Sequence, residues 1–247
     1  MIKKALLLLL CICLLATVVA CKRDPAPTPT PTPTPDSGAH QGGTDGEEES
    51  TLRFTYPIAG TDVTVEVHQG GSLSVTGTGA VPDYDYAYDQ PWYEHGGNSP
   101  TERSDAEGGT LLVKAVIVEE GITGIGENAF SEMARLETVS LPSTLQVIAY
   151  KGFASCRNLH TVTGGNGLTT IEASAFRDCN QLATIELSAA LTLVEESAFD
   201  DLILPGVSRS LAVTFRGNEA AWHALIGGAG VQLGNDALKN ATVTYAP

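Results

Sequence analysis

A repeat with a period of 23 runs through the second half of the chain and constrains its fold more than any other feature. Phe130, Phe153, Phe176 and Phe199 recur at this spacing. Four further apolar columns and one column of small residues keep the same spacing: Ile125, Ile148, Ile171 and Val194; Ile122, Leu145, Leu168 and Leu191; Leu136, Leu159 and Leu182; Val139, Val162 and Ile185; Ala129, Gly152, Ala175 and Ala198. Units that repeat at such a period stack and bury one continuous core, so the columns predict a solenoid.

Each unit contains the pattern Leu-x-x-Val-x-Leu, as in Leu136, Val139 and Leu141. Residues two apart point to the same face of a strand, so this pattern predicts a short strand with one buried face. A turn follows, and an Ala-Phe pair closes the unit on an expected short helical or 3₁₀ segment. One strand and one such segment in about 20–29 residues is the leucine-rich repeat pattern. The fold class predicted is therefore α/β, a leucine-rich repeat solenoid with a ribbon of parallel strands.

The register of the repeats also predicts where the strands lie. They are expected near residues 115–118, 138–141, 161–164 and 184–187. The third strand has the weakest pattern, because Gly164 stands where a neighbouring unit has an inward Leu. Beyond Phe199 the register slips, and residues 200–209 are interpreted as an insertion. A fifth strand is expected where three apolar residues alternate, at Leu211, Val213 and Phe215.

One column of the repeat contains two of the five cysteines. Cys156 and Cys179 are one repeat period apart, with Met133 before them and Leu202 after them in the same column. A position that accepts Met, Cys and Leu favours a mid-sized apolar side chain, and a free cysteine packs as one. The column predicts two buried thiols. A Cys156–Cys179 disulfide and a reactive thiol are the alternatives.

The first fifty residues carry signals for export. Residues 1–20 combine two lysines with an unbroken apolar run, which is typical of a signal peptide. The following Val-Val-Ala-Cys21 resembles the processing box of bacterial lipoproteins, so Cys21 is predicted to carry a lipid. An ordinary signal peptide cut before Cys21, or an uncleaved anchor, is the alternative. Residues 21–50 alternate Pro and Thr and then become acidic, which predicts an extended spacer that holds a domain away from a membrane.

The net charge of the chain is −15, and loss of the two lysines with the signal peptide leaves 12 basic against 29 acidic residues, or −17. Nucleic acids bind proteins through Lys and Arg that neutralise phosphates, so no nucleic-acid partner is predicted. Direct adhesion to an anionic lipid surface is disfavoured for the same reason. A membrane contact is therefore expected only through the lipid on Cys21.

The repeat units resemble the BspA-like leucine-rich repeats of bacterial surface proteins. Residues 118–130 (VEEGITGIGENAF) follow the unit of that family closely, and residues 71–92 and 216–245 resemble the segments that often flank such repeats. The resemblance implies a small β-rich N-terminal cap, the repeats and an α+β C-terminal cap, over residues 51–110, 111–205 and 206–247 respectively. Members of this family are associated with adhesion to host matrix proteins or with coaggregation between bacteria.

Two partial matches to ligand-binding motifs do not lead to a predicted site. Residues 124–129 (GIGENA) fit a dinucleotide fingerprint, but their Ile and Ala belong to repeat columns. A calcium loop requires Gly at its sixth position, and Tyr88 stands there in the otherwise matching set of Asp83, Asp85, Asp89 and Glu94. The histidines lack metal-ligand spacing, and no catalytic constellation is present. The chain is predicted not to be an enzyme and to use no cofactor or metal.

Two surfaces are candidates for binding. The outward positions of the strands form a predicted concave face of mostly hydroxyl side chains: Thr138, Ser140, Thr161, Thr163, Thr184 and Glu186. Solenoid ribbons are common binding faces, although Thr also forms strands well on a purely solvated face. The second candidate is an aromatic contact loop of Tyr84, Tyr86, Tyr88, Trp92 and Tyr93. Aromatic residues favour interfaces, and the alternative is that Trp92 and some of the tyrosines cover the end of the solenoid.

Together these features predict a lipid-anchored, surface-exposed protein of the bacterial envelope, located at the outer membrane or cell surface. It would mediate protein–protein interaction or adhesion, with a host matrix protein or a bacterial surface protein as partner. The alternative is a structural or assembly protein of the cell envelope with no adhesive role. A glycan-binding or enzymatic module is a third hypothesis.

Overall fold

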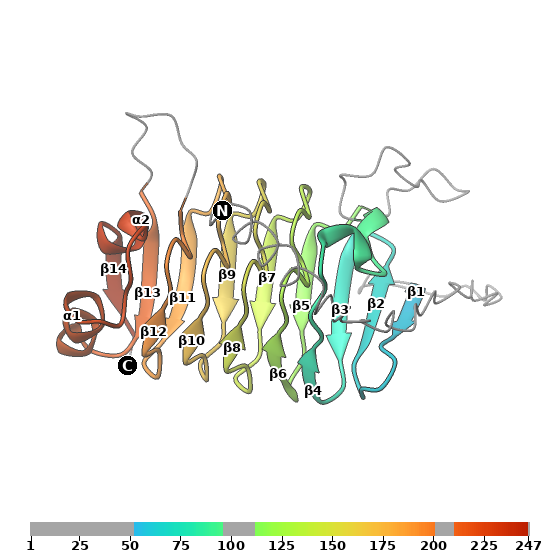
Figure 1. The fold of residues 1–247 in the computed structure, drawn as a ribbon, viewed down its shortest axis with the longest axis horizontal. Coiled ribbons are helices and arrows are strands. Elements are labelled where there is room, and N and C mark those ends of the chain that lie inside the picture. Colours follow the sequence, from blue (N-terminus) through green and yellow to red (C-terminus); the bar gives the residue numbers. More distant parts are fainter. Residues whose placement is uncertain (1–51, 96–111, 201–209, 247) are drawn as a thin grey trace, which may run out of the picture. The chain divides into compact units, whose positions relative to one another are not determined.

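The computed structural model describes residues 52–95, 112–200 and 210–246. The predicted signal peptide, the lipidation site Cys21, the linker and residues 201–209 of the predicted insertion lie outside these ranges. Within them, successive coils of chain each contribute one strand to a larger sheet and one to a smaller sheet (Figure 1).

The larger sheet has nine strands in the order β1-β2-β3-β5-β7-β9-β11-β13-β14. From β3 to β14 all pairs are parallel, whereas β1, β2 and β3 form an antiparallel meander. The strands are β1 (Leu52–Pro57), β2 (Thr64–His68), β3 (Ser72–Thr76), β5 (Ala115–Val118), β7 (Thr138–Leu141), β9 (Thr161–Gly164), β11 (Thr184–Ser188), β13 (Ala212–Arg216) and β14 (Thr242–Tyr245). The four repeat strands and the fifth strand predicted from the sequence are thus confirmed.

The smaller sheet has five short parallel strands in the order β12-β10-β8-β6-β4. They are β4 (Gly79–Val81), β6 (Ile122–Ile125), β8 (Val147–Ile148), β10 (Thr170–Ile171) and β12 (Leu193–Val194). The described helices lie outside the central repeats: η1 (Ala87–Asp89), η2 (Tyr93–His95), α1 (Glu219–Gly227) and α2 (Asp236–Lys239). Helix α1 is capped at its N-terminus by Asn218, whose side chain accepts a hydrogen bond from the Ala221 amide at 2.9 Å.

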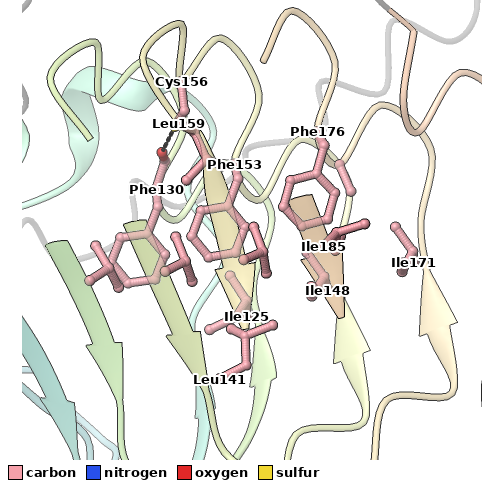
Figure 2. Close-up of a cluster of buried hydrophobic side chains, with 14 of the residues drawn as sticks. Ile125, Phe130, Leu141, Ile148, Phe153, Cys156, Leu159, Ile171, Phe176 and Ile185 are labelled. Atoms are coloured by element: carbon pink, nitrogen blue, oxygen red, sulfur yellow. Dashed lines mark hydrogen bonds between the residues drawn. The ribbon is translucent and has the colours of Figure 1, made fainter. Parts of the chain in front are cut away.

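The repeated phenylalanines form a ladder of stacked rings inside the core. Phe130, Phe153, Phe176 and Phe199 follow one another with ring centroids 5.3–5.5 Å apart and planes within 15° of parallel. Figure 2 shows three of these rings in line, with the inward Ile and Leu side chains of the two sheets around them. No single unit could bury so large a ring alone, so each Phe depends on the units before and after it.

The Ala-Phe segments are turns, and the expectation that they form short helical or 3₁₀ segments was wrong. A residue with positive φ precedes each pair, and these residues are Asn128, Lys151, Ser174 and Ser197. A second positive φ follows at Glu132, Ser155 and Asp178. Left-handed residues interrupt a right-handed helix, so a helix cannot propagate across this part of the unit.

Alternate residues of these turns bond to the next repeat, and the residues between them donate to the carbonyl three positions earlier in their own turn. The amide of Phe130 donates to the Gly152 carbonyl at 2.8 Å, that of Phe153 to Ala175 at 2.9 Å, and that of Phe176 to Ala198 at 2.8 Å. The residues two before and two after each of these phenylalanines donate forward in the same way. These bonds form a third ladder of hydrogen bonds beside the two sheets. They satisfy backbone groups of the turns that helical hydrogen bonds would otherwise have satisfied.

The thiols of the cysteine column are buried and form no disulfide, which confirms the packing prediction over the disulfide. Cys156 donates to the carbonyl of Phe130 at 3.1 Å, and Cys179 donates to the carbonyl of Phe153 at 3.1 Å. The first of these contacts is drawn in Figure 2. Each thiol therefore fills an apolar position and also satisfies the carbonyl of a ladder residue in the preceding unit.

The strand ladders continue into residues that lack the sequence repeat. At the N-terminal end, β3 pairs with β5 in register and β4 pairs with β6. At the C-terminal end, β13 pairs with β11, and Val231 bridges Val194 of β12. The sheets thus cross both boundaries that the sequence suggested between repeats and flanking segments, and each flank adds a coil of irregular length.

Candidate binding surfaces

The outward side chains of the larger sheet form two columns in register. Strand pairing aligns the first column as Ser72, Ala115, Thr138, Thr161, Thr184, Ala212 and Thr242. It aligns Ser74, Ile117, Ser140 and Thr163 in a second column. Glu186, two residues after Thr184 on β11, continues this column, and strand pairing aligns it with Thr214 and Thr244. The six residues predicted for the concave face all lie in these columns, on three adjacent strands. The residues between them point inward, as the period of two requires, and all are buried except Val243 of β14, which is partly buried.

Several hydroxyls of these columns bond to one another or to the sheet. The Thr184 hydroxyl donates to that of Thr161 at 3.1 Å, and the hydroxyls of Thr214 and Thr244 lie 3.4 Å apart. Thr138 and Ser140 are exposed. The face is therefore partly ordered by its own hydrogen bonds and partly open to a partner.

Glu186 has a structural role within the predicted face. Its carboxylate accepts from the Gly164 amide at 2.8 Å and from the Arg216 guanidinium at 3.0 Å. Burial works to raise its pKa, but the hydrogen bonds from Gly164 and Arg216 outweigh it, and the pKa lies below its ordinary value. Gly164 itself has φ of 83°, and a Cβ there would lie 2.1 Å from the Leu141 carbonyl oxygen. The third strand thus has Gly in place of an inward Leu because the backbone of Leu141 leaves no room for a side chain at this position.

The sequence prediction missed the outer hydroxyl members of both columns, on β3, β13 and β14. These residues are Ser72, Ser74, Thr214, Thr242 and Thr244. Their strands alternate apolar and hydroxyl residues, which is a usable signal for an exposed sheet face. They fall out of the repeat register, however, so the repeat alone could not align them with the central strands.

The predicted aromatic loop separates into a buried and an exposed part. Trp92 is fully buried, stacks on Phe130 at 5.5 Å, and donates from Nε1 to the Ala129 carbonyl at 3.1 Å. Tyr84 packs edge-on against Trp92 at 5.7 Å, and burial raises its pKa well above the ordinary value. These two residues extend the core, as the alternative interpretation of the loop predicted.

Tyr86 and Tyr88 form the exposed part. Their side chains are 57% and 62% exposed, and their rings stack with centroids 5.0 Å apart and planes 6° from parallel. Local desolvation, together with the charges of Tyr86, Asp89 and Asp85, raises the pKa of Tyr88. Tyr93 is half-buried, and desolvation with the nearby Glu132 raises its pKa. The Tyr86–Tyr88 pair is therefore the most exposed ring surface within this loop.

The carboxylates of the calcium-like pattern hold the loop in shape. Asp83 accepts from the Glu127 amide at 2.7 Å, and Asp89 accepts from the Tyr86 amide at 3.1 Å. Among the described residues, no group of three or more His, Cys, Asp or Glu side chains is arranged to hold a metal ion.

The glycines of the dinucleotide-like stretch serve packing against the preceding coil. A Cβ on Gly126 would lie 2.3 Å from the Pro82 carbonyl oxygen, and one on Gly124 would lie 3.1 Å from Cβ of Ala80. These glycines let β4 and the following Pro82 approach β6 closely, so they serve strand packing. In the described ranges, no helix has the length and apolar character needed to cross a bilayer.

Comparison with known proteins identifies the repeats. Residues 109–219 match the family model described as BspA type leucine rich repeat region, in six copies. No curated protein matches the chain. Similar solved structures include a leucine-rich repeat protein of Eubacterium ventriosum, with 22% identity, 74% of this chain and 45% of that one covered, and a TM-score of 0.48.

Two further solved structures are similar over part of their length. A leucine-rich cell surface protein of Faecalibacterium prausnitzii has 16% identity, with 66% of this chain and 45% of that one covered and a TM-score of 0.39. The pneumococcal vaccine antigen PcpA has 18% identity, with 68% and 41% covered and a TM-score of 0.32. The chain spans less than half the length of each of these three proteins.

Proposed function

The chain belongs to the BspA-type leucine-rich repeat family, and from this we propose that it is a lipid-anchored, surface-exposed binding protein of the bacterial envelope. It acts through protein–protein contact and not through catalysis. Its partner is a protein of the host matrix or of another bacterial surface. Nucleic acid is no partner, because the chain is strongly acidic.

The observation that carries the binding role is the outer face of the nine-stranded sheet. Two columns of mostly small polar side chains run across seven strands in register, over a core in which nearly every inward residue is buried. A partner that lies on such a face meets a regular, pre-ordered surface, so little conformational entropy is lost on contact. Exposed Ile117 adds an apolar group among the hydroxyls.

The location rests on the N-terminal sequence. In the proposed mature protein Cys21 carries a diacylglycerol, and the sequence of residues 25–35 alternates Pro and Thr, a composition typical of extended spacers. One lipid chain gives only marginal membrane binding, whereas two chains give stable anchoring. The spacer would hold the repeats clear of the membrane surface, where a partner can reach them.

Protease treatment of intact cells tests the location. The described region should be digested on intact cells at the rate seen after lysis, and a Cys21→Ala variant should no longer partition with the membrane. If the chain resists protease until the cells are lysed, it faces the periplasm. That result would support the alternative of a structural or assembly protein of the envelope.

Binding of purified chain to immobilised matrix proteins and to bacterial surface fractions tests the face. Thr138→Arg places a long charged side chain in the middle of the outer columns and should weaken binding at least about tenfold, the scale of a lost interface hot spot. Thr123→Arg is the matched control, because Thr123 is an exposed strand residue of the smaller sheet. Equal binding by both variants would rule out the outer face as the binding surface.

A further inference from the structure

The Tyr86–Tyr88 pair is exposed although its loop is firmly held. Gln90 is buried and donates from its side-chain amide to the carbonyls of Asn128 and Ser131. The Tyr84 amide donates to the Glu127 carbonyl at 2.9 Å, and Asn128 returns a side-chain bond to the Tyr84 carbonyl at 2.9 Å. The backbone of the pair is therefore anchored on both sides to the first turn of the repeats.

This anchoring makes the two rings a pre-organised aromatic surface. Each is more than half exposed in a chain whose other large aromatic rings are mostly buried. Tyrosine supplies contact area with only two side-chain torsions to fix, and stacking already restricts both rings here. Mobile tyrosines would lose entropy on binding, and these two lose little.

The electrostatic surroundings of the pair are negative. Asp83, Asp85 and Asp89 are exposed on the same loop, and no Lys or Arg occurs in the sequence from residue 54 to residue 102. The raised pKa of Tyr88 has the same origin, in part, because Asp89 and Asp85 oppose a further negative charge there. A neutral ligand would gain little from this charge, whereas a cation is attracted by it and by the faces of the rings.

We propose that the Tyr86–Tyr88 pair, with Asp85 beside it, is a docking site for a Lys- or Arg-rich segment of a partner protein. The basic side chains lie over the tyrosine rings, and the carboxylates attract them at longer range. This assignment rests on the proposed binding function and names the chemical class of its partner. The site is distinct from the outer face of the larger sheet, because it is built on the turn side of the first repeat.

Binding to synthetic peptides tests the site directly. The purified full chain is titrated with a basic peptide rich in Lys and Arg, with the same peptide carrying Gln at those positions, and with a neutral soluble glycan. The basic peptide should bind most tightly. Its affinity should fall when ionic strength rises from about 0.01 M to about 0.15 M, which shortens the Debye length from about 30 Å to about 8 Å.

Variants separate the rings from the general acidity of the chain. Replacing both tyrosines by Ala should weaken binding of the basic peptide by at least about fivefold, the scale of an exposed cation–π contact. Replacing both by Phe keeps the ring faces and should stay within about twofold of the parent. Tyr150→Ala is the matched control, because Tyr150 is 37% exposed on another turn. Asp85→Asn should lower the affinity and reduce its salt dependence.

The outcomes distinguish this site from the broader function. Equal binding of the basic and Gln peptides, or an unchanged affinity in the double Ala variant, would overturn the proposed site. Binding of the glycan in place of the basic peptide would also overturn it and would assign the rings to sugar stacking. Capture by immobilised matrix proteins that survives the double Ala change would leave the proposed function standing without this site. Unfolding curves that match the parent establish that the variants are folded.

Discussion

The indole ring of Trp92 stacks on the ring of Phe130 at 5.5 Å with planes 28° from parallel, and so extends the phenylalanine ladder by one ring. The two residues are far apart in the sequence, and Trp92 belongs to no repeat unit. A residue outside the periodic sequence thus occupies the position that a Phe would take in one more unit. The end of the ladder is covered by the same kind of contact that links its interior members.

Truncation of an interior ring should destabilise the protein strongly. Phe153→Ala removes a fully buried ring stacked on both sides, so we expect the free energy of unfolding to fall by about 3–5 kcal/mol. Urea unfolding followed by circular dichroism measures this loss. Tyr150→Ala, on a nearby exposed side chain, should change stability by no more than about 0.5 kcal/mol. A loss for Phe153→Ala as small as that of the control would contradict the stacked ladder.

Substitution of Trp92 should separate the stacking from the hydrogen bond. Trp92→Phe keeps a ring on Phe130 but leaves the Ala129 carbonyl without its indole donor, and we expect a cost of about 1–3 kcal/mol. Trp92→Ala removes both and should cost about 3–5 kcal/mol. The two unfolding midpoints should therefore be clearly separated, and coincident midpoints would show that the ring itself contributes little.

The two buried cysteines should be unreactive in the folded protein. Both thiols are at most 1% exposed and donate to backbone carbonyls, so labelling by a water-soluble thiol reagent should require unfolding. In denaturant both should react rapidly with the reagent. Fast native-state labelling of either one, or a Cys156–Cys179 disulfide found by mass spectrometry, would contradict this packing.

The Glu186–Arg216 pair should add a small pH-dependent contribution to stability. The hydrogen bonds from the Gly164 amide and from Arg216 outweigh burial and hold the folded pKa of Glu186 below its ordinary value of 4.5, so these contacts stabilise the fold above about that pH. The contribution is lost as the pH falls through the lower folded pKa, because the unfolded chain takes up the proton first. Arg216 is 39% exposed and solvent screens the pair, which limits the effect to about 0.2–1 kcal/mol.

Glu186→Gln tests this linkage. The difference in unfolding free energy between the parent and the variant should be largest near neutral pH and should shrink as the pH falls below about 4.5. Glu219→Gln is a suitable control, because Glu219 is exposed in the first turn of α1. A difference that stays constant between neutral and acidic pH would show that the charge of Glu186 is not involved.

Asn235 should be essential for closing the C-terminal end. It is fully buried, accepts from the Phe199 amide at 3.0 Å, and donates to the carbonyls of Glu195 at 2.8 Å and Gln232 at 3.1 Å. Asn235→Ala leaves these buried backbone groups without partners, at about 1–3 kcal/mol for each. Unfolding curves should shift accordingly, whereas Asn240→Ala, at an exposed position, should shift them far less.

The parts of the fold that the sequence predicted are those that depend on neighbouring repeats. Val139, Val162 and Ile185 recur at equal spacing, so their strands and their shared buried face could be assigned without coordinates. The contacts of Trp92 and Asn235 could not be assigned in this way. Trp92 continues the ring ladder with a different side chain, and Asn235 accepts from the Phe199 amide with its side chain where interior units use a backbone carbonyl. The turn conformation was mistaken for a helix, since positive φ at Lys151 or Ser155 has no strong sequence signal.

The candidate surfaces, like the fold, were predicted only where the sequence pattern is local or periodic. Alternation of polar and apolar residues located Thr138 and Ser140 on an outward face, because that pattern is local. The hydrogen-bonded ion pair of Glu186 and Arg216 joins two strands, β11 and β13, that the repeat register does not align. The aromatic loop gave no periodic signal, so the sequence left open whether its rings bind a partner or cover the end of the solenoid. The structure buries Trp92 against Phe130 and leaves Tyr86 exposed.

Because the turns bond forward to the next unit, the interior units present the same hydrogen-bonding groups to their two neighbours. Each turn presents amide donors to the unit that follows and carbonyl acceptors to the unit that precedes it. A whole repeat unit could therefore be duplicated or deleted within the array while both flanking segments still met the groups they meet now. Duplication or deletion of the coding repeat could in this way lengthen or shorten the outer face by whole units. The size of the binding surface could then evolve without a change in the two flanking segments.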